Sequence, residues 1–170
     1  LKEDRYNLKL KPIEPLVPRC VRLGVAERLR SDGSVETVLD EETVDHAIDK
    51  LRREGVESLA VCFLFSYINP AHEQKVAEKL QAAFPDSYIS LSHDVLPQIR
   101  EFDRVSTTVV NAYVGPALGR YLQSLQERLT LCGGSNEILV MQSNGGVGSV
   151  EESICLAVRS ILSGPAGGVA

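Results

Sequence analysis

Alternating and periodic apolar residues divide the first half of the chain into short strands and helices. Apolar residues alternate from Val21 to Val25, and a second apolar run follows the polar Asp32-Gly33 step, which predicts a β-hairpin. Asp40 provides an N-cap for a helix that Gly55 ends, because apolar residues recur at helical spacing between them. The predicted inward face of this helix contains Val44, Ala47, Ile48 and Leu51.

The Leu59–Phe65 run is continuously apolar, as expected for a strand that is buried on both faces. Asn69-Pro70 then begins a second helix, and Tyr88–Leu91 forms a further short strand. This order of strands and helices predicts a parallel sheet with right-handed crossovers. We therefore expect an α/β lobe over residues 20–95, preceded by an extended lead-in or linker over residues 1–19.

The remainder, residues 96–170, has a helix-rich α/β pattern. A helical pattern begins near Ile99 and runs to Tyr113, where Gly115-Pro116 is expected to interrupt it. A second helix is predicted beyond this break, because apolar residues recur on one face from Leu118 to Leu129. The change in pattern near residue 96 is the predicted domain boundary.

Composition and charge restrict the partners and the location that we expect. The chain has 170 residues and a formal net charge of −5, which argues against nucleic acid or an anionic membrane as a partner. Its longest apolar run is far shorter than the roughly 20 residues that span a bilayer. With no secretion leader recognisable, we expect a cytoplasmic protein. The absence of an initiator Met favours an internal fragment of a longer chain.

Cysteine and histidine are scattered along the sequence. The four cysteines form no Cys-x-x-Cys pair, so we predict buried free thiols in preference to disulfides. The three histidines are equally dispersed, and none has the short ligand spacing of a zinc site. We therefore expect no metal site made by protein ligands alone. The cysteines are Cys20, Cys62, Cys132 and Cys155.

One predicted helix face carries a row of polar side chains that ends in a small residue. Arg104, Thr108, Asn111 and Gly115 recur at helical spacing, so they lie along one side of the helix. Such a row is suited to line a ligand cleft. Alternatively, Glu101 and Arg104 form a solvated helical ion pair, worth only a few tenths of a kcal/mol. The spacing leaves both interpretations open.

A predicted strand over Ile138–Met141 ends in a glycine-rich loop, and Ser149 with Glu152 forms a capping box for a helix that runs to about Leu162. Ligands favour the loops beyond strand ends, and helix N-termini favour anions. The alternative is an ordinary tight turn in which glycine supplies a positive φ. The candidate ligand-binding side chains of this loop are Gln142, Ser143 and Asn144.

Small residues also fill the last segment, Ser163–Gly168. They permit close approach, either of backbone to a phosphate or of one helix to another, and close packing is the simpler interpretation. The glycine-rich loop matches neither the Walker pattern nor the dinucleotide fingerprint. A serine esterase and a glycosidase are poorly supported, because the sequence has no Gly-x-Ser-x-Gly elbow and no recognisable facing pair of carboxylates.

Three of these segments, in this order, resemble the hydantoinase A/5-oxoprolinase family, which includes ATP-dependent N-methylhydantoinase A-type subunits and the related acetone carboxylase beta subunits. The resembling segments are Asp94–Tyr113, Met141–Gly146 and Ser163–Val169. The earlier segment Ser66–Glu73 also matches in character, so the resemblance covers most of the chain. Residues 96–170 then correspond to the start of the hydantoinase A-type domain.

The resemblance implies part of an actin/sugar-kinase/chaperone-like ATPase fold, in which a small α/β lobe precedes a helix-rich α/β segment. It implies a cyclic amidase that uses Mg-ATP to open a hydantoin or 5-oxoproline ring. The implied partners are the remainder of the same chain, a hydantoinase B-type subunit or domain, and the small cyclic amide. The family's two phosphate loops are absent from these residues. ATP and Mg²⁺ are therefore expected in the parent protein, and neither is expected to be held by this fragment alone.

By the same resemblance, six residues are candidates for the substrate cleft: Glu101, Arg104, Asn111, Gln142, Ser143 and Asn144. Three glycines are candidates for positions near the nucleotide: Gly164, Gly167 and Gly168. Two alternatives to the cyclic amidase stay open. In one, the parent is a ketone carboxylase subunit of the same family; in the other, the lobe over residues 20–95 is a non-catalytic module for subunit contacts. The isolated fragment is expected to be inactive.

Overall fold

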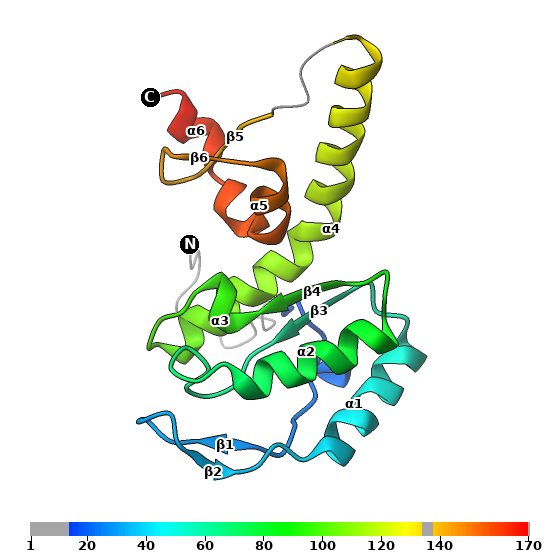
Figure 1. Cartoon of the computed structure of the whole chain (residues 1–170), viewed down its shortest axis with the longest axis vertical. Coiled ribbons are helices and arrows are strands. Elements are labelled where there is room, and N and C mark those ends of the chain that lie inside the picture. The colour runs from blue at the N-terminus through cyan, green and yellow to red at the C-terminus, as the bar shows by residue number, and fades with distance from the viewer. Residues whose placement is uncertain (1–13, 134–137, 170) are drawn as a thin grey trace, which may run out of the picture.

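A computed structural model describes residues 14–133 and 138–169, and Figure 1 shows how their elements are arranged. The fold is mixed α/β, as predicted. Its described strands pair as two-stranded sheets, β1 with β2, β3 with β4 and β5 with β6. In chain order the elements are η1 (Arg19–Val21), β1 (Arg28–Leu29), β2 (Val35–Thr37), α1 (Glu41–Glu54), β3 (Ser58–Val61), α2 (Ala71–Ala83), β4 (Tyr88–Leu91), α3 (Ser92–Val95), α4 (Glu101–Leu131), β5 (Val140–Met141), β6 (Val147–Gly148), α5 (Val150–Cys155), η2 (Ala157–Ser160) and α6 (Ser163–Gly167).

The predicted hairpin is confirmed at its turn and is wrong at its first strand. β1 and β2 are antiparallel, and Gly33 has a φ of 83° in the turn between them. Asp32 supports the turn by accepting a hydrogen bond from the Ser34 backbone N–H. The first strand begins at Arg28, because the chain around residues 19–21 forms a 3-10 turn before it. Most of the predicted lead-in, residues 1–13, lies outside the described residues.

Both predicted helices of the lobe are confirmed, together with the residues that begin and end them. Asp40 accepts hydrogen bonds from the N–H groups of Glu42 and Thr43 at the start of α1, and Gly55 ends the helix in the left-handed conformation. Asn69 accepts a hydrogen bond from the N–H of Ala71, the first residue of α2. Local capping signals therefore position both helices.

β3 and β4 form the predicted parallel pair, in the register Ser58↔Tyr88 to Val61↔Leu91. One face of this pair packs against α1 and α2 to form the apolar core: Leu39, Val44, Ile48, Leu59, Val61, Val76 and Leu80. The predicted strand over Leu59–Phe65, buried on both faces, is wrong, since β3 ends at Val61 and Ala60 is exposed. β3 alternates instead, with Leu59 and Val61 buried in the apolar core and Ala60 between them exposed on the other face.

The interruption expected at Gly115-Pro116 is also wrong, since α4 is one helix with Pro116 inside it. Proline removes one helical N–H donor and commonly bends a helix, and Figure 1 shows α4 changing direction along its length. The helix contacts β3, β4 and α3 with one part, and α5 and η2 with another. The domain boundary near residue 96 therefore stays a prediction. Across the described residues, no helix has the length and apolar character needed to cross a membrane.

The C-terminal part contains a small hairpin and three short helical segments, of which α5 and η2 contact α4 and α6 contacts β5 (Figure 1). The capping box is confirmed at its hydroxyl, because Ser149 accepts a hydrogen bond from the Glu152 N–H. The predicted helix to about Leu162 is wrong, since α5 ends at Cys155. The carbonyl oxygens of Ile154 and Cys155 accept side-chain hydrogen bonds from other elements, and the chain turns there into η2.

All four cysteines are free, as predicted, but the prediction that they are buried is wrong for three of them. Cys20, Cys132 and Cys155 are exposed. Cys62, directly after β3, is half-buried, and its desolvation raises the pKa of the thiol to about 11. Because the thiolate is the reactive form, Cys62 is an unreactive packing residue at neutral pH.

Candidate functional site

A buried carboxylate lies at the carboxyl ends of β3 and β4, where parallel strands usually present functional groups. Glu73, in the first turn of α2, is fully buried. Its Oε1 accepts hydrogen bonds from the Phe63 N–H at 2.8 Å and from the Ser92 hydroxyl at 2.5 Å. Its Oε2 lies 3.1 Å from the His93 backbone N and 2.7 Å from His93 Nδ1. The positive N-terminal end of α2 also stabilises this charge.

The backbone of Phe63 links Glu73 to a buried arginine on α4. The Phe63 carbonyl accepts a hydrogen bond from Arg104 Nη2 at 2.8 Å, while Nη1 donates to the Gln98 carbonyl at 2.9 Å. The Arg104 guanidinium also lies 5.3 Å from the centre of the Tyr67 ring, within cation–π range. Arg104 is 1% exposed, so the backbone N–H and C=O of one residue, Phe63, join a buried carboxylate on α2 to a buried guanidinium on α4.

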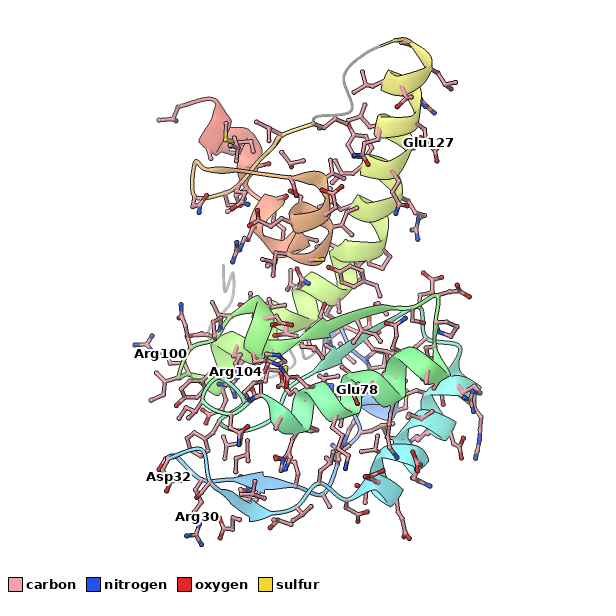
Figure 2. The ribbon with its side chains drawn as sticks, in the orientation of Figure 1. Arg30, Asp32, Glu78, Arg100, Arg104 and Glu127 are labelled. Carbon is pink, nitrogen blue, oxygen red and sulfur yellow. The ribbon has the colours of Figure 1, made fainter. Side chains whose placement is uncertain are left out.

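The predicted ion pair between Glu101 and Arg104 is not formed. Glu101 is exposed, whereas Arg104 extends into the lobe, as Figure 2 shows beside the outward-pointing Arg100. The distance from Arg100 Nη1 to Asp103 Oδ2 is 3.9 Å, and both of these side chains are solvated. Surface pairs of this kind contribute little to stability. The polar row on α4 is therefore an inward, buried face.

Asn111 is the second fixed point on this face, and it is completely buried. Its Nδ2 lies 3.1 Å from the Tyr88 hydroxyl, 2.9 Å from the Ser90 hydroxyl and 3.0 Å from the Cys155 carbonyl. Its Oδ1 accepts a hydrogen bond of 2.9 Å from the Val158 N–H. One amide side chain therefore holds together β4, α4 and the turn between α5 and η2.

Tyr88 completes this junction. Its hydroxyl lies 2.5 Å from the Ile154 carbonyl oxygen and 2.9 Å from that of Cys155, and burial raises the pKa of the phenol. The Tyr88 ring packs directly on Gly115 of α4, where an added Cβ would lie 2.2 Å from the ring. Gly115 therefore permits the approach that brings α4 to the sheet.

The glycine-rich loop after β5 is a tight hairpin turn, which corresponds to the simpler of the two interpretations. The Gln142 N–H donates to the Gly146 carbonyl at 2.8 Å, and Gly145 has a φ of 84°. The Asn144 Oδ1 accepts a hydrogen bond of 2.9 Å from the Gly146 N–H. The loop therefore connects two strands, and it does not lead from a strand directly into a helix as expected.

This turn is fastened to the segment that leads into α6. The Ser143 hydroxyl donates to the Arg159 carbonyl at 2.6 Å and accepts from the Leu162 N–H at 3.1 Å. Gln142 is 6% exposed, and its Nε2 lies 3.5 Å from Glu152 Oε1. The same oxygen lies 3.1 Å from Arg159 Nη1. Ser143 and Asn144 are themselves exposed at the surface.

The three candidate glycines of α6 are exposed beside this turn. A Cβ added at Gly167 would lie 3.4 Å from Met141, so the start of the hairpin packs on α6. A Cβ at Gly164 would have open space around it, and one at Gly168 would lie 3.6 Å from the Gly164 carbonyl. No steric contact therefore requires glycine at position 164.

The nine candidate residues divide into two groups. The turn residues Gln142, Ser143 and Asn144 lie beside the α6 glycines, whereas Glu101 and Arg104 lie at the α3 end of α4 (Figure 1). Asn111 lies between them, because it contacts both the β4 strand and η2. The turn residues Ser143 and Asn144 are exposed, while the buried Arg104 and Asn111 hold the neighbouring elements together.

Comparison with known proteins identifies the family of this chain. The family model described as the hydantoinase/oxoprolinase N-terminal region matches residues 1–84, and the hydantoinase/oxoprolinase model matches residues 104–170. The chain belongs to the hydantoinase/oxoprolinase family. Caprolactamase subunit alpha from Pseudomonas jessenii is 41% identical over 167 residues, and the match covers 97% of this chain and 24% of that subunit. The 5-oxoprolinase of Saccharomyces cerevisiae is 36% identical, with 98% of this chain and 12% of that enzyme covered.

Solved structures of the family agree with this fold. The crystal structure of the ATP-dependent caprolactamase from Pseudomonas jessenii superposes with a TM-score of 0.87 at 41% identity, covering 98% of this chain and 24% of that one. The nucleotide-free acetone carboxylase structure gives a TM-score of 0.80 at 30% identity, covering 92% of this chain and 22% of that one. The chain thus spans about a quarter of the length of these family members.

Metal-ligating side chains are not clustered in the described ranges, where no group of three or more His, Cys, Asp or Glu side chains is arranged to hold a metal ion. The cation nearest in sequence to the α6 glycines, Arg159, is paired with Glu152.

Sequence reasoning missed the residues that organise this part of the family fold. Glu73 and Tyr88 belong to an ordinary helix and strand pattern, and neither stood out as polar residues of a site. One available signal was the family likeness of Ser66–Glu73, which ends on the buried carboxylate. The other was the lack of an apolar stripe on the side of α4 that carries Arg104 and Asn111.

Proposed function

We propose that this chain is part of an ATP-dependent cyclic amidase that opens a lactam, hydantoin or 5-oxoproline ring. The observation that carries the proposal is the match to the ATP-dependent caprolactamase, which combines 41% identity with a TM-score of 0.87 over 98% of the chain. Coupling to ATP hydrolysis supplies the free energy and the activation that a resonance-stabilised amide needs before water opens it. The remainder of the polypeptide, in an actin/sugar-kinase/chaperone-like ATPase fold, supplies the nucleotide site with Mg²⁺.

Within this enzyme we assign the exposed β5–β6 turn and α6 to the edge of the ligand cleft. Asn144 supplies its exposed side-chain amide there, and the space around Gly164 is open. The Ser143 hydroxyl holds the turn, since its donor already binds the Arg159 carbonyl. Arg104 and Asn111 act behind the cleft, because the Arg104 Nη atoms and the Asn111 amide already bind acceptors within the fold. Glu101 is the weakest of the six cleft candidates, since it lies at the far end of α4 (Figure 1).

The reaction class is tested on the full-length parent protein together with its candidate B-type subunit. ADP release is measured with caprolactam, hydantoin, N-methylhydantoin, 5-oxoproline, and acetone with bicarbonate. Stimulation by one cyclic amide, with formation of the ring-opened amino acid, supports the proposal and identifies the substrate. A flat response to every compound contradicts it. Because ATP is an intracellular co-substrate, the proposed reaction takes place in the cytoplasm.

The cleft assignment is tested with Asn144→Asp. This variant keeps the Oδ1 acceptor for the Gly146 N–H, so the turn is preserved, while the amide donor is replaced by a negative charge. We expect substrate-stimulated ADP release to fall about tenfold or more, since a lost donor to a ligand costs about 1–3 kcal/mol. Glu127→Gln, an exposed change on α4 (Figure 2), is the control and leaves the rate unchanged. Equal rates in both variants contradict the assignment.

A ketone carboxylase subunit is the second candidate function, and the acetone carboxylase structure favours it with a TM-score of 0.80 over 92% of the chain. Both reactions begin with a carbonyl compound that ATP activates. ADP release that requires acetone and bicarbonate together, with no response to any cyclic amide, assigns the protein to this branch.

A further inference from the structure

The long helix α4 has its polar and apolar sides reversed. The buried side carries Arg104, Thr108 and Asn111, each 1% exposed or less. The side half a turn away is apolar and exposed, with Phe102 at 83% and Tyr113 at 65% of their full accessible surface. A surface helix of a globular protein has the opposite arrangement, with its apolar side against the core and its polar side in water.

The outward side of α4 forms a continuous apolar stripe, defined by residues that recur at helical spacing: Phe102, Val105, Val109, Tyr113 and Pro116. The two other positions on this side, Ser106 and Ala117, are small and uncharged. Ile99, just before the helix, is 70% exposed. A side without any charged residue over four helical turns is unusual on a water-exposed surface.

The described elements leave most of the stripe uncovered: Phe102, Val105 and Tyr113 are exposed, and Val109 and Pro116 are half-buried. β3, β4, α5 and η2 all contact α4, and the buried residues of the helix show which side they meet: Arg104, Thr108, Asn111, Ala112, Gly115, Gly119 and Leu122. On this inward side the two Nη atoms of Arg104 and the Asn111 amide already have hydrogen-bond partners. Turning the helix to bury the stripe would break those bonds and leave the buried partners unpaired.

We propose that the apolar stripe of α4 is an internal interface of the parent polypeptide, covered by a segment that lies outside these 170 residues. The chain covers 24% of the caprolactamase alpha subunit, so about three quarters of such a relative is available to supply the covering segment. The covering surface is itself apolar. α4 is then a central helix between two layers, polar toward the sheet and apolar toward the second layer, whichever substrate the enzyme uses.

An interface within one polypeptide fits the stripe better than a contact between subunits. Interfaces that are permanently buried resemble a protein core, whereas those that form and separate carry charged and polar groups at their rims. The stripe has no charged position, and it continues the packing of a helix whose other side is fully buried. A second subunit and a second copy of the chain are the other occupants, and the test distinguishes them.

The test measures the accessibility of the stripe in the full-length parent subunit. Phe102→Cys and Tyr113→Cys are made separately and labelled with a maleimide, and the label on each peptide is quantified by mass spectrometry so that the native cysteines are counted apart. Asp103→Cys is the matched control, because Asp103 lies on the same helical turn but outside the stripe and is exposed. Labelling is compared for the isolated monomeric subunit, at high subunit concentration, and with the second subunit added.

We expect both stripe cysteines to react at least about tenfold more slowly than the control in the isolated monomer, because labelling then requires a local opening of the fold. Protection that develops only at high concentration assigns the stripe to a second copy and overturns the proposal. Protection that develops only with the second subunit overturns it as well, and so does fast labelling throughout. If the variants do not fold, hydroxyl-radical footprinting of Phe102 and Tyr113 in the unmodified subunit gives the same comparison.

Discussion

The two faces of the β3–β4 pair are held by different kinds of interaction. On one face, Leu59 and Val61 pack with apolar residues of α1 and α2. On the other, the Ser90 hydroxyl accepts a hydrogen bond from Asn111 of α4. The Phe63 carbonyl, just after β3, accepts one from Arg104 of the same helix. Apolar packing tolerates changes of shape, whereas each buried polar group needs its own partner. The first face therefore makes a stable lobe, and the second fixes α4 in one position.

The largest effect is expected for Glu73→Ala, which removes the acceptor at the centre of the polar contacts. The donors of Phe63, Ser92 and His93 would lose their partner in a buried site, and we expect a loss of about 3–5 kcal/mol in the free energy of unfolding. Urea denaturation of the parent protein measures it. Glu78→Ala, exposed on the same helix (Figure 2), is the control and changes stability by less than about 0.5 kcal/mol. Equal losses would show that the polar face contributes nothing special.

The apolar face is tested with Leu80→Ala. Leu80 is 4% exposed within the core of α1, α2 and β3, so the lost burial and the cavity cost about 3 kcal/mol. The control Leu131→Ala removes the same atoms at a position that is 87% exposed. Because the core is separate from the α4 contacts, Leu80→Ala combined with Glu73→Ala tests whether the two faces are energetically independent. Additive losses sharpen the contrast, and strong coupling would remove it.

Two neighbouring glycines of α4 test how closely the polar face must approach the sheet. Gly115→Ala places a methyl group 2.2 Å from the Tyr88 ring, and we expect a loss of about 2 kcal/mol through the displaced Tyr88 and Asn111 contacts. Gly119→Ala meets its nearest atom at 3.5 Å, an ordinary contact, and is expected to be neutral or to stabilise the helix. Thermal denaturation of both variants measures the difference. A harmless Gly115→Ala would mean that α4 is free to shift.

The smallest effect is a dependence of stability on alkaline pH. Burial raises the pKa of Cys62 from 9.0 to about 11, so the thiol stays neutral in the folded protein at a pH where the unfolded chain has ionised. Its contribution is complete below pH 9 and is lost as the pH rises toward 11. Between neutral pH and pH 10, the free energy of unfolding should therefore fall by about 1 kcal/mol more in the wild type than in Cys62→Ala. Cys132→Ala, an exposed cysteine, should keep the wild-type pH profile.

The sequence by itself determined the local elements of this protein. Asp40 and Gly55 marked α1, Asn69 marked the start of α2, and Asp32-Gly33 marked the hairpin turn, all where the structure has them. These signals work because a cap or a turn acts on backbone groups a few residues away. The family likeness likewise gave the family, because whole segments match it in residue type and order.

Only the tertiary structure decided which polar residues face inward and which face water. Tyr88 contacts a carbonyl 66 positions further along the chain, and Arg104 contacts one 41 positions before it. Periodicity could place Arg104 and Asn111 on one side of α4, but nothing local says whether that side meets a ligand, water or a sheet. Pro116 stayed within the helix for the same reason. The contacts that α4 makes with β3 and β4 and with α5 and η2 outweigh one lost helical hydrogen bond.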